Sequence, residues 1–156
     1  MKDYFQKMFA YEQWANNDVT YALVKTEELP PKALSIMSHV IDAQIVWLCR
    51  IKKIETHVRV WEDYTIEEIS GKLSKSSSDL IELVNGISNE NLKKIIEYKN
   101  TKGEEFKSSL EDILTHLLIH SSYHRGQVVL LIKPHVSVLP YTDYIHYIRT
   151  VRDSSV

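Results

Sequence analysis

Three histidines follow one another at intervals of four residues in the second half of the chain. His116, His120 and His124 lie in the apolar stretch 114–127, which therefore holds three of the seven histidines of the sequence. In an α-helix, a step of four residues turns the side chain only about 40° past one full turn, so the three imidazoles form a slowly drifting row on one face. Neighbouring imidazoles in such a row can bind the same ion.

The helix face that carries the histidine row is otherwise apolar. It includes Ile113, Leu117, Val128 and Leu131, so we expect the imidazoles to point into the protein. An unsatisfied buried polar group costs about 1 to 3 kcal/mol, and each neutral imidazole has a lone pair to satisfy. A divalent metal ion would satisfy two of these imidazoles together.

His39 is the candidate for a third ligand from another helix. It lies on the inner stripe of the predicted second helix. Two histidines four residues apart plus one from a facing helix would leave a metal such as zinc an open position for water or substrate, as in catalytic sites. Spacing does not decide whether His116 or His124 pairs with His120. A hydrogen-bonded core histidine is the alternative interpretation of His39.

Other metal-site motifs are disfavoured by the residues present. The segment 120–124 matches the outer histidines of the zinc-protease motif, but Ser121 stands where that motif has its catalytic glutamate. No Glu-x-x-His occurs, although ferritin-like two-metal sites require it. Cys49 lies ten residues after His39, about 15 Å further along the same helix. We therefore predict a site of histidines alone. Tyr123 and Gln127 are candidates for contacts with the ligands or with a substrate, and a purely structural role is the equal alternative for each.

Apolar residues at spacings of three and four predict four long helices, over residues 3–25, 31–55, 65–86 and 109–133. Three of the four have a side chain suited to cap their start. Asp3 with Gln6 and Thr65 with Glu68 resemble capping boxes, and Ser109 caps the last helix. Long connections after the second and third helices leave room for crossover topology.

Smaller features accompany these helices. Residues 93–99 and 104–107 flank a plausible turn and predict a small hairpin. A short final helix is expected after Thr142, which would cap it. Gly126 lies in the middle of the fourth helix and costs about 1 kcal/mol relative to alanine there, which favours close approach of another backbone or of a ligand. We predict an all-α four-helix bundle with crossover connections, in one domain spanning residues 1–156.

Composition limits the possible functions. The chain has 156 residues, 44% of them hydrophobic, with 19 basic and 21 acidic residues and a net charge of -2. This balance gives no support to nucleic-acid binding. The single cysteine, Cys49, excludes an internal disulfide. Because no signal peptide or membrane span is evident, we expect a cytoplasmic protein that does not act on membranes.

The chain resembles the DinB-like family of metal-binding four-helix bundles, also called the DinB/YfiT type. The most specific part is the segment 116–127, which is similar to the family pattern His-x-x-x-His-x-x-x-His-Arg-Gly-Gln. Further matches are the segments 11–16 (Tyr-Glu-Gln-Trp-Ala-Asn), 38–40 (Ser-His-Val) and 140–144 (Pro-Tyr-Thr-Asp-Tyr). Together they span nearly the whole chain in the expected order.

The resemblance implies that His39, His120 and His124 bind a divalent metal, zinc, nickel or a similar ion, with His116 one turn away. It also implies a bundle with crossovers and a homodimer. Some relatives are metal-dependent transferases of low-molecular-weight thiols, and one activity is a thiol-dependent isomerisation. A small-molecule substrate, possibly such a thiol, is thereby expected.

Three classes of function remain open at this point. The first is a metal-dependent enzyme, either a thiol S-transferase or a hydrolase that uses a metal-activated water. The second is a non-catalytic metal-binding protein, structural or stress-related, in which the ion ties two helices together. The third is a metal-free bundle that acts through a partner surface.

Overall fold

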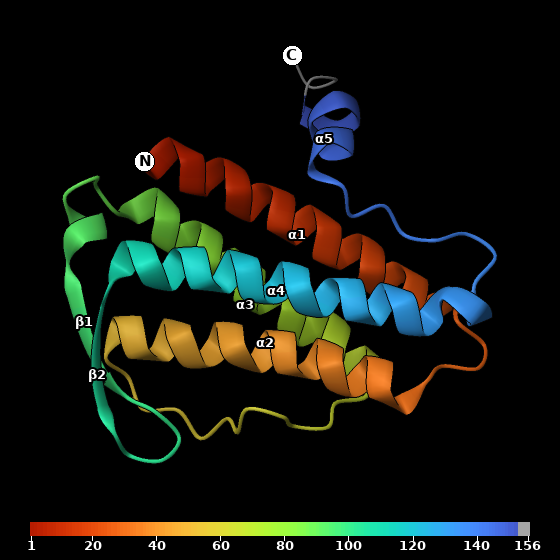
Figure 1. The fold of residues 1–156 in the computed structure, drawn as a ribbon, viewed down its shortest axis with the longest axis horizontal. Coiled ribbons are helices and arrows are strands. Elements are labelled where there is room, and N and C mark those ends of the chain that lie inside the picture. Colours follow the sequence, from red (N-terminus) through yellow and green to blue (C-terminus); the bar gives the residue numbers. More distant parts are fainter. Residues whose placement is uncertain (153–156) are drawn as a thin grey trace.

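The computed structural model describes residues 1–152 and consists mainly of four long helices (Figure 1). They are α1 (Lys2–Lys25), α2 (Pro31–Lys52), α3 (Ile66–Gly86) and α4 (Leu110–Ile132). Both α1 and α2 pack against α3 and against α4. The predicted all-α four-helix bundle is confirmed.

The connections between helices cross the bundle. In Figure 1 the colours run in the same direction along α2 and α3, so these two neighbours are parallel, and the segment 53–65 returns along the length of the bundle to join them. A hairpin then leads from the end of α3 to the start of α4. The predicted departure from up-down-up-down order is therefore correct, and one long loop lies against the outside of α2.

Two of the three predicted helix caps are present. The Thr65 hydroxyl accepts a hydrogen bond from the Glu68 backbone N–H at 3.3 Å, and the Glu68 carboxylate accepts one from the Thr65 N–H at 2.9 Å. Ser109 Oγ accepts from the Asp112 N–H at 3.1 Å at the start of α4. Each cap satisfies backbone donors that would lack a partner in the first turn.

The capping box predicted at Asp3 and Gln6 is wrong. The N-cap of α1 is Met1, without a side-chain cap, because the helix already begins at Lys2 and Asp3 lies within its first turn. The Gln6 amide instead donates to Asn85 Oδ1 on α3 at 2.7 Å. A contact between helices has replaced the predicted local one.

The second helix, α2, is long and highly apolar. It ends at Lys52, slightly before the predicted limit, and the next residue, Lys53, has the left-handed φ of 56° that often terminates helices. By length and composition alone α2 could cross a membrane, but 61% of its most apolar 18-residue window is buried in the bundle. This burial shows that α2 is a core helix of the bundle.

The predicted hairpin is confirmed at one end of the bundle. After the 3-10 turn η1 (Asn91–Lys93), strand β1 (Ile95–Lys99) pairs antiparallel with β2 (Glu105–Ser109). Gly103 in the connecting turn has a φ of 83°, a conformation that glycine adopts without strain.

The short C-terminal helix is also present and lies over α1 (Figure 1). It comprises α5 (Tyr144–Tyr147) and the π-helical turn η3 (Ile148–Arg152), reached from α4 through η2 (Lys133–His135). Its cap is Asp143, which accepts from the His146 N–H at 2.9 Å, and not Thr142 as predicted. Thr142 instead uses its backbone carbonyl to accept a hydrogen bond from Tyr11 Oη at 2.6 Å.

The buried core has a polar middle. One apolar cluster lies toward the hairpin and includes Phe5 and Leu114, whereas a second lies toward the other end and includes Met37 and Val128. On each of the four helices, buried polar residues lie between the positions that belong to the first cluster and those that belong to the second. They are Glu12, Asn16, Asp42, Gln44, Ser76, Ser77, Ser121 and Arg125. His39 also lies at this level on α2, so the candidate site belongs to a polar layer between two apolar clusters.

Candidate metal centre

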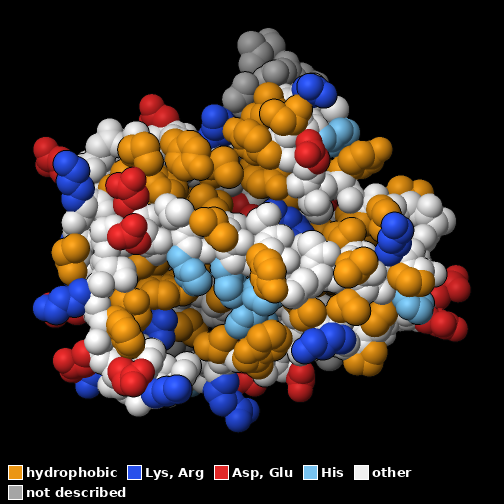
Figure 2. Space-filling model, viewed as in Figure 1, with side chains coloured by type: hydrophobic (Ala, Val, Ile, Leu, Met, Phe, Trp, Pro, Cys, Tyr) orange, Lys and Arg blue, Asp and Glu red, His pale blue; other side chains and the backbone are white. Residues whose placement is uncertain are grey.

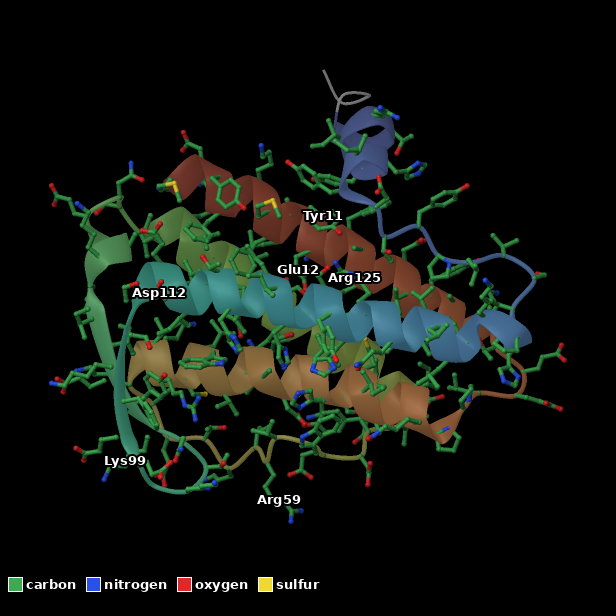
Figure 3. All side chains as sticks on the ribbon, viewed as in Figure 1. Tyr11, Glu12, Arg59, Lys99, Asp112 and Arg125 are labelled. Atoms are coloured by element: carbon green, nitrogen blue, oxygen red, sulfur yellow. The ribbon has the colours of Figure 1, made fainter. Side chains whose placement is uncertain are left out.

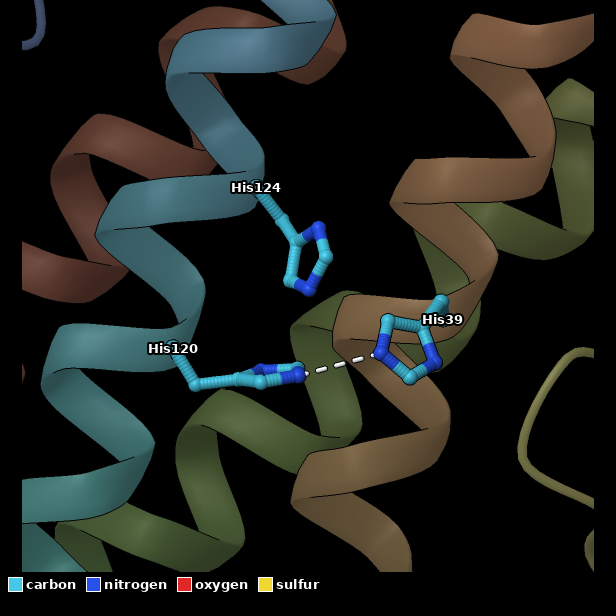
Figure 4. A group of neighbouring side chains, drawn as sticks. All are labelled: His39, His120 and His124. Carbon is cyan, nitrogen blue, oxygen red and sulfur yellow. Dashed lines mark hydrogen bonds between the residues drawn. The ribbon is translucent and has the colours of Figure 1, made fainter.

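Three of the predicted histidines meet where α2 and α4 pack together (Figure 4). His39 comes from α2, and His120 and His124 come from successive turns of α4. The ligand nitrogens of the three side chains all lie within 4.8 Å of one another. The closest pair, His39 Nε2 and His120 Nε2, is 3.0 Å apart. The structure therefore brings the three residues to one point.

His116 lies outside this group. Its ring packs against Trp47, with centroids 5.6 Å apart, and against His120 at 5.3 Å. The drift of about 40° per four residues accounts for this, since it separates His116 from His124 by about 80° around α4. The position of His39 groups His124, and not His116, with His120. His57, in the connection between α2 and α3, is exposed.

Two neighbours orient the imidazoles. His124 Nδ1 lies 2.9 Å from Gln127 Oε1, so it donates its proton there and leaves Nε2 with a free lone pair. The His39 ring stacks on the indole of Trp61, with centroids 3.8 Å apart and planes 6° from parallel. Gln127, a candidate for such a contact from the sequence, thus fixes one tautomer.

The arrangement fits a bound divalent ion. Two nitrogens that share a tetrahedral zinc at about 2.0–2.1 Å lie about 3.3 Å apart, close to the observed 3.0 Å between His39 and His120. His39 Nε2 and His120 Nε2 are within hydrogen-bonding distance of each other, whereas His39 Nδ1 is one of three buried side-chain polar atoms without a partner among the described residues. Among residues 1–152, no cysteine, carboxylate or fourth histidine joins the cluster.

The surroundings favour the neutral form of His39 and of His120. Burial lowers the pKa of His39 to about 4, helped by the nearby charges of His124 and Lys32. Burial also lowers the pKa of His120 to about 4, with further contributions from His124, His39 and His116. Neutral imidazoles present the lone pairs that a metal ion needs.

These pKa values predict how the stability of the metal-free protein depends on pH. The folded-state pKa values of His39 and His120 lie below the value of about 6.5 for an unfolded histidine. The unfolded chain therefore binds more protons between about pH 6.5 and pH 4, and the free energy of unfolding should fall as the pH falls through this range.

Urea denaturation of metal-free protein at a series of pH values tests this prediction. His120→Asn should show a weaker loss of stability over that range than the parent chain. His57→Asn is the matched control, because His57 is exposed, and it should follow the parent profile. Superimposable profiles of the parent and His120→Asn would contradict the prediction.

The site is accessible from one side. Figure 2 shows histidine side chains at the surface between α4 and α2, near the middle of the face. Trp61 is 49% exposed and Tyr123 is 65% exposed, and the Tyr123 ring lies 5.1 Å from that of His124. An additional ligand can thus approach the cluster from solvent.

A buried ion pair lies behind the cluster, next to His124 in sequence. Figure 3 shows Glu12 on α1 and Arg125 on α4 pointing toward one another. Arg125 Nη1 donates to Glu12 Oε2 and to Asn16 Oδ1, both at 2.8 Å, and Nη2 donates to Tyr11 Oη at 3.1 Å. This network joins α1 to α4 and holds the turn that carries His124.

Gly126 does not have the role expected from the sequence. No atom outside its own helix and chain neighbours lies within 4 Å of the position that a Cβ would occupy. Neither a second backbone nor a neighbouring side chain compensates for this glycine, so the predicted close approach by the protein is wrong.

Two residues beside the cluster were not predicted. Trp61 lies in the long connection between α2 and α3. A loop has no repeating pattern of side chains from which its contact with His39 could be predicted. Asp42 is fully buried on α2 and binds the same connection through its carboxylate. The sequence did contain a signal for Asp42, since it is an acidic residue three positions after His39 in a highly apolar helix. A carboxylate buried there needs several hydrogen-bond donors from another segment.

Comparison with known proteins agrees with this site and fold. The model of the DinB family matches residues 1–152. The chain is also similar to Protein DinB of Bacillus subtilis (strain 168), with 22% identity in an alignment of 172 positions that covers 95% of each chain. The match spans all the helices and includes all three clustered histidines. The chain belongs to the DinB family.

Proposed function

We propose that the protein is a metal-dependent enzyme that binds zinc, nickel or a similar divalent ion through His39, His120 and His124 and transfers a low-molecular-weight thiol to an electrophile. The observation that carries this proposal is the cluster of three imidazole nitrogens from two helices, open to solvent and without a fourth protein ligand among residues 1–152. A structural metal site is usually closed by four protein ligands, whereas a catalytic one keeps a position open.

Within residues 1–152, neither Cys49 nor Ser121 is placed to act as a nucleophile at the cluster. Cys49 lies ten residues after His39 on α2, a rise of about 15 Å. Ser121, which is adjacent to His120, is buried and bonded to Asn16. The nucleophile must therefore arrive from solution.

A thiol suits this site better than water does. A divalent ion held here would favour the thiolate form of a bound thiol. The cluster contains no carboxylate that could act as a base, and a thiol with a pKa of about 8.5 needs less help to lose its proton than water does. This difference favours thiol transfer over hydrolysis by a metal-activated water.

His116 can accept the proton of the incoming thiol at a ring nitrogen. It lies next to the cluster, with its ring 5.3 Å from that of His120. Burial and the charge of Arg50 lower its pKa below the usual value, so its imidazole is neutral near pH 7. The sulfur electron pair then forms the bond to the electrophilic carbon, and the leaving group departs with its own electron pair.

Turnover tests the proposal. Metal-loaded protein should accelerate the reaction of a small thiol with 1-chloro-2,4-dinitrobenzene, and removal of the metal with a chelator should abolish the acceleration. His120→Ala should lose both metal binding and turnover, whereas the control His57→Ala should keep both. One bound metal per chain with no metal-dependent turnover would instead favour the non-catalytic structural function.

We also propose that the protein works in the cytoplasm as a homodimer, on small molecules and not on nucleic acid or membranes. The near-neutral charge of -2 supports the choice of substrate class. A groove of about 790 Å³ between α1, α4 and α5 supports self-association, because its walls include the exposed apolar residues Tyr4, Ile119 and Tyr123.

A charge in this groove should weaken the dimer. Ile119 is 66% exposed, so Ile119→Glu should leave the fold intact while it places a carboxylate in an apolar interface. Light scattering over a concentration series should show a dimer for the parent chain and a shift toward monomer for the variant. Parent protein that remains monomeric at all concentrations would contradict this part of the proposal.

A further inference from the structure

The long connection between α2 and α3 is attached to the bundle beside the histidine cluster by the carboxylate of Asp42 and by Ser38 Oγ, which accepts a longer hydrogen bond from the Tyr64 N–H at 3.4 Å. Asp42 Oδ2 accepts hydrogen bonds from the backbone N–H groups of Trp61 at 3.0 Å and Glu62 at 2.9 Å, and its Oδ1 accepts from the Tyr64 hydroxyl at 2.7 Å. Asp42 is 0% exposed. A buried carboxylate whose donors all come from one segment fixes that segment in place.

The backbone at Trp61 requires such a restraint. Its φ is 122°, in the region that bulky residues rarely adopt. Conformations of this kind persist only where the surroundings determine them. The two hydrogen bonds from the Trp61 and Glu62 N–H groups to the same oxygen of Asp42 hold the backbone in this conformation.

The restraint determines what covers His39. Because Trp61 is held at this point, its indole lies flat on the imidazole, with centroids 3.8 Å apart. On the indole, the Lys32 ammonium group lies 5.2 Å from the ring centroid. The His39 ring cannot rotate about its Cβ–Cγ bond without displacing the indole, so its Nε2 stays directed at His120, 3.0 Å away.

We propose that Asp42 is a positioning residue for the metal centre, which acts by holding Trp61 against His39 and so fixes the imidazole in its ligating orientation. This inference rests on the metal-binding part of the proposed function. It assigns a role in that site to the connection 53–65, which contributes no ligand. Loss of a group that orients a ligand weakens metal binding by about 10- to 100-fold.

The variant Asp42→Asn tests the inference, because it keeps the side-chain shape but replaces one accepting oxygen with a donating NH₂ group. Ser76→Ala is the matched control. It removes a buried hydrogen bond of 2.7 Å from Ser76 on α3 to Gln44, which lies on α2 like Asp42. It leaves the connection 53–65 unchanged. Trp61→Ala removes the stacked ring, and Trp61→Phe keeps a flat ring in its place.

Two readouts are needed. The first is the NMR shift of the His39 ring protons in metal-free protein, which the stacked indole moves upfield. Asp42→Asn and Trp61→Ala should move these signals toward unstacked values, and Ser76→Ala should not. The second is the affinity for zinc by calorimetry, which should fall about 10-fold or more in Asp42→Asn and in Trp61→Ala while the control and Trp61→Phe stay near the parent value.

The double variant separates a shared effect from two independent ones. If Asp42 acts through Trp61, Asp42→Asn combined with Trp61→Ala should bind zinc no more weakly than Trp61→Ala alone. Additive losses, unchanged His39 shifts in Asp42→Asn, or an equal loss of affinity in Ser76→Ala would overturn the inference. If the parent chain binds no metal, the proposed function fails, whereas the His39 shifts still decide whether Asp42 holds Trp61 in place.

Discussion

Replacement of Arg125 by methionine should lower the free energy of unfolding by about 3–5 kcal/mol, as expected when one partner of a buried ion pair is removed. The side chains of Arg125 and Glu12 are only 2% and 4% exposed, with 2.8 Å between Nη1 and Oε2. Without the guanidinium group, the Glu12 carboxylate remains buried without a counter-charge, and Asn16 Oδ1 and Tyr11 Oη lose a donor. Chemical denaturation of the metal-free protein measures the loss.

Two further variants show that the loss comes from the unpaired charge. Glu12→Met combined with Arg125→Met should recover much of the stability, because a buried ion pair replaced as a whole by apolar residues is often neutral. Lys107→Ala breaks the exposed pair with Glu97 on the hairpin and should leave the denaturation midpoint nearly unchanged. An Arg125→Met protein as stable as the parent would contradict this account of the polar layer.

Saturation with zinc or nickel should raise the stability of the protein substantially. A ligand present at about 100 times its Kd and bound only by the folded state adds about 2.7 kcal/mol. For a chain of this size, that corresponds to an increase of roughly 5–10 °C in the thermal midpoint. The increase is expected because one ion would tie His39 on α2 to His120 and His124 on α4, whose positions are 81 or more residues apart in sequence.

The same measurement on variants locates the effect. His39→Ala should abolish the metal-dependent shift, because it removes the only ligand from α2. His116→Ala should retain most of the shift, since His116 is outside the cluster. A metal-dependent shift of the same size in His39→Ala as in the parent chain would show that the ion binds elsewhere.

The sequence predicted the elements and the three clustered residues because both depend on local periodicity. The spacing of four on α4 and the inner face of α2 single out His116, His120, His124 and His39 as candidates, and the family resemblance adds the choice of His124 over His116. The caps at Thr65 and Ser109 likewise involve residues three positions apart. Spacing alone could not separate His116 from His124, because that choice depends on where α2 crosses α4.

The supporting contacts could not be predicted in this way because they join distant positions. Arg125 and Glu12 are 113 residues apart, and Trp61 reaches Asp42 from a loop without periodicity. Gln6 is a case in which a local contact was predicted and a distant one is found. It was expected to cap its own helix, but it binds Asn85 on α3 instead. Gly126 was expected to mark a close approach, but the space around it is open.

The most direct test of the metal site is anomalous diffraction from crystals of zinc-loaded protein at the zinc absorption edge. We expect one strong peak per chain between α2 and α4, within about 2.0–2.1 Å of a nitrogen of each of His39, His120 and His124. A peak bound by any other set of residues, or no peak between these three imidazoles at saturating zinc, would contradict the account.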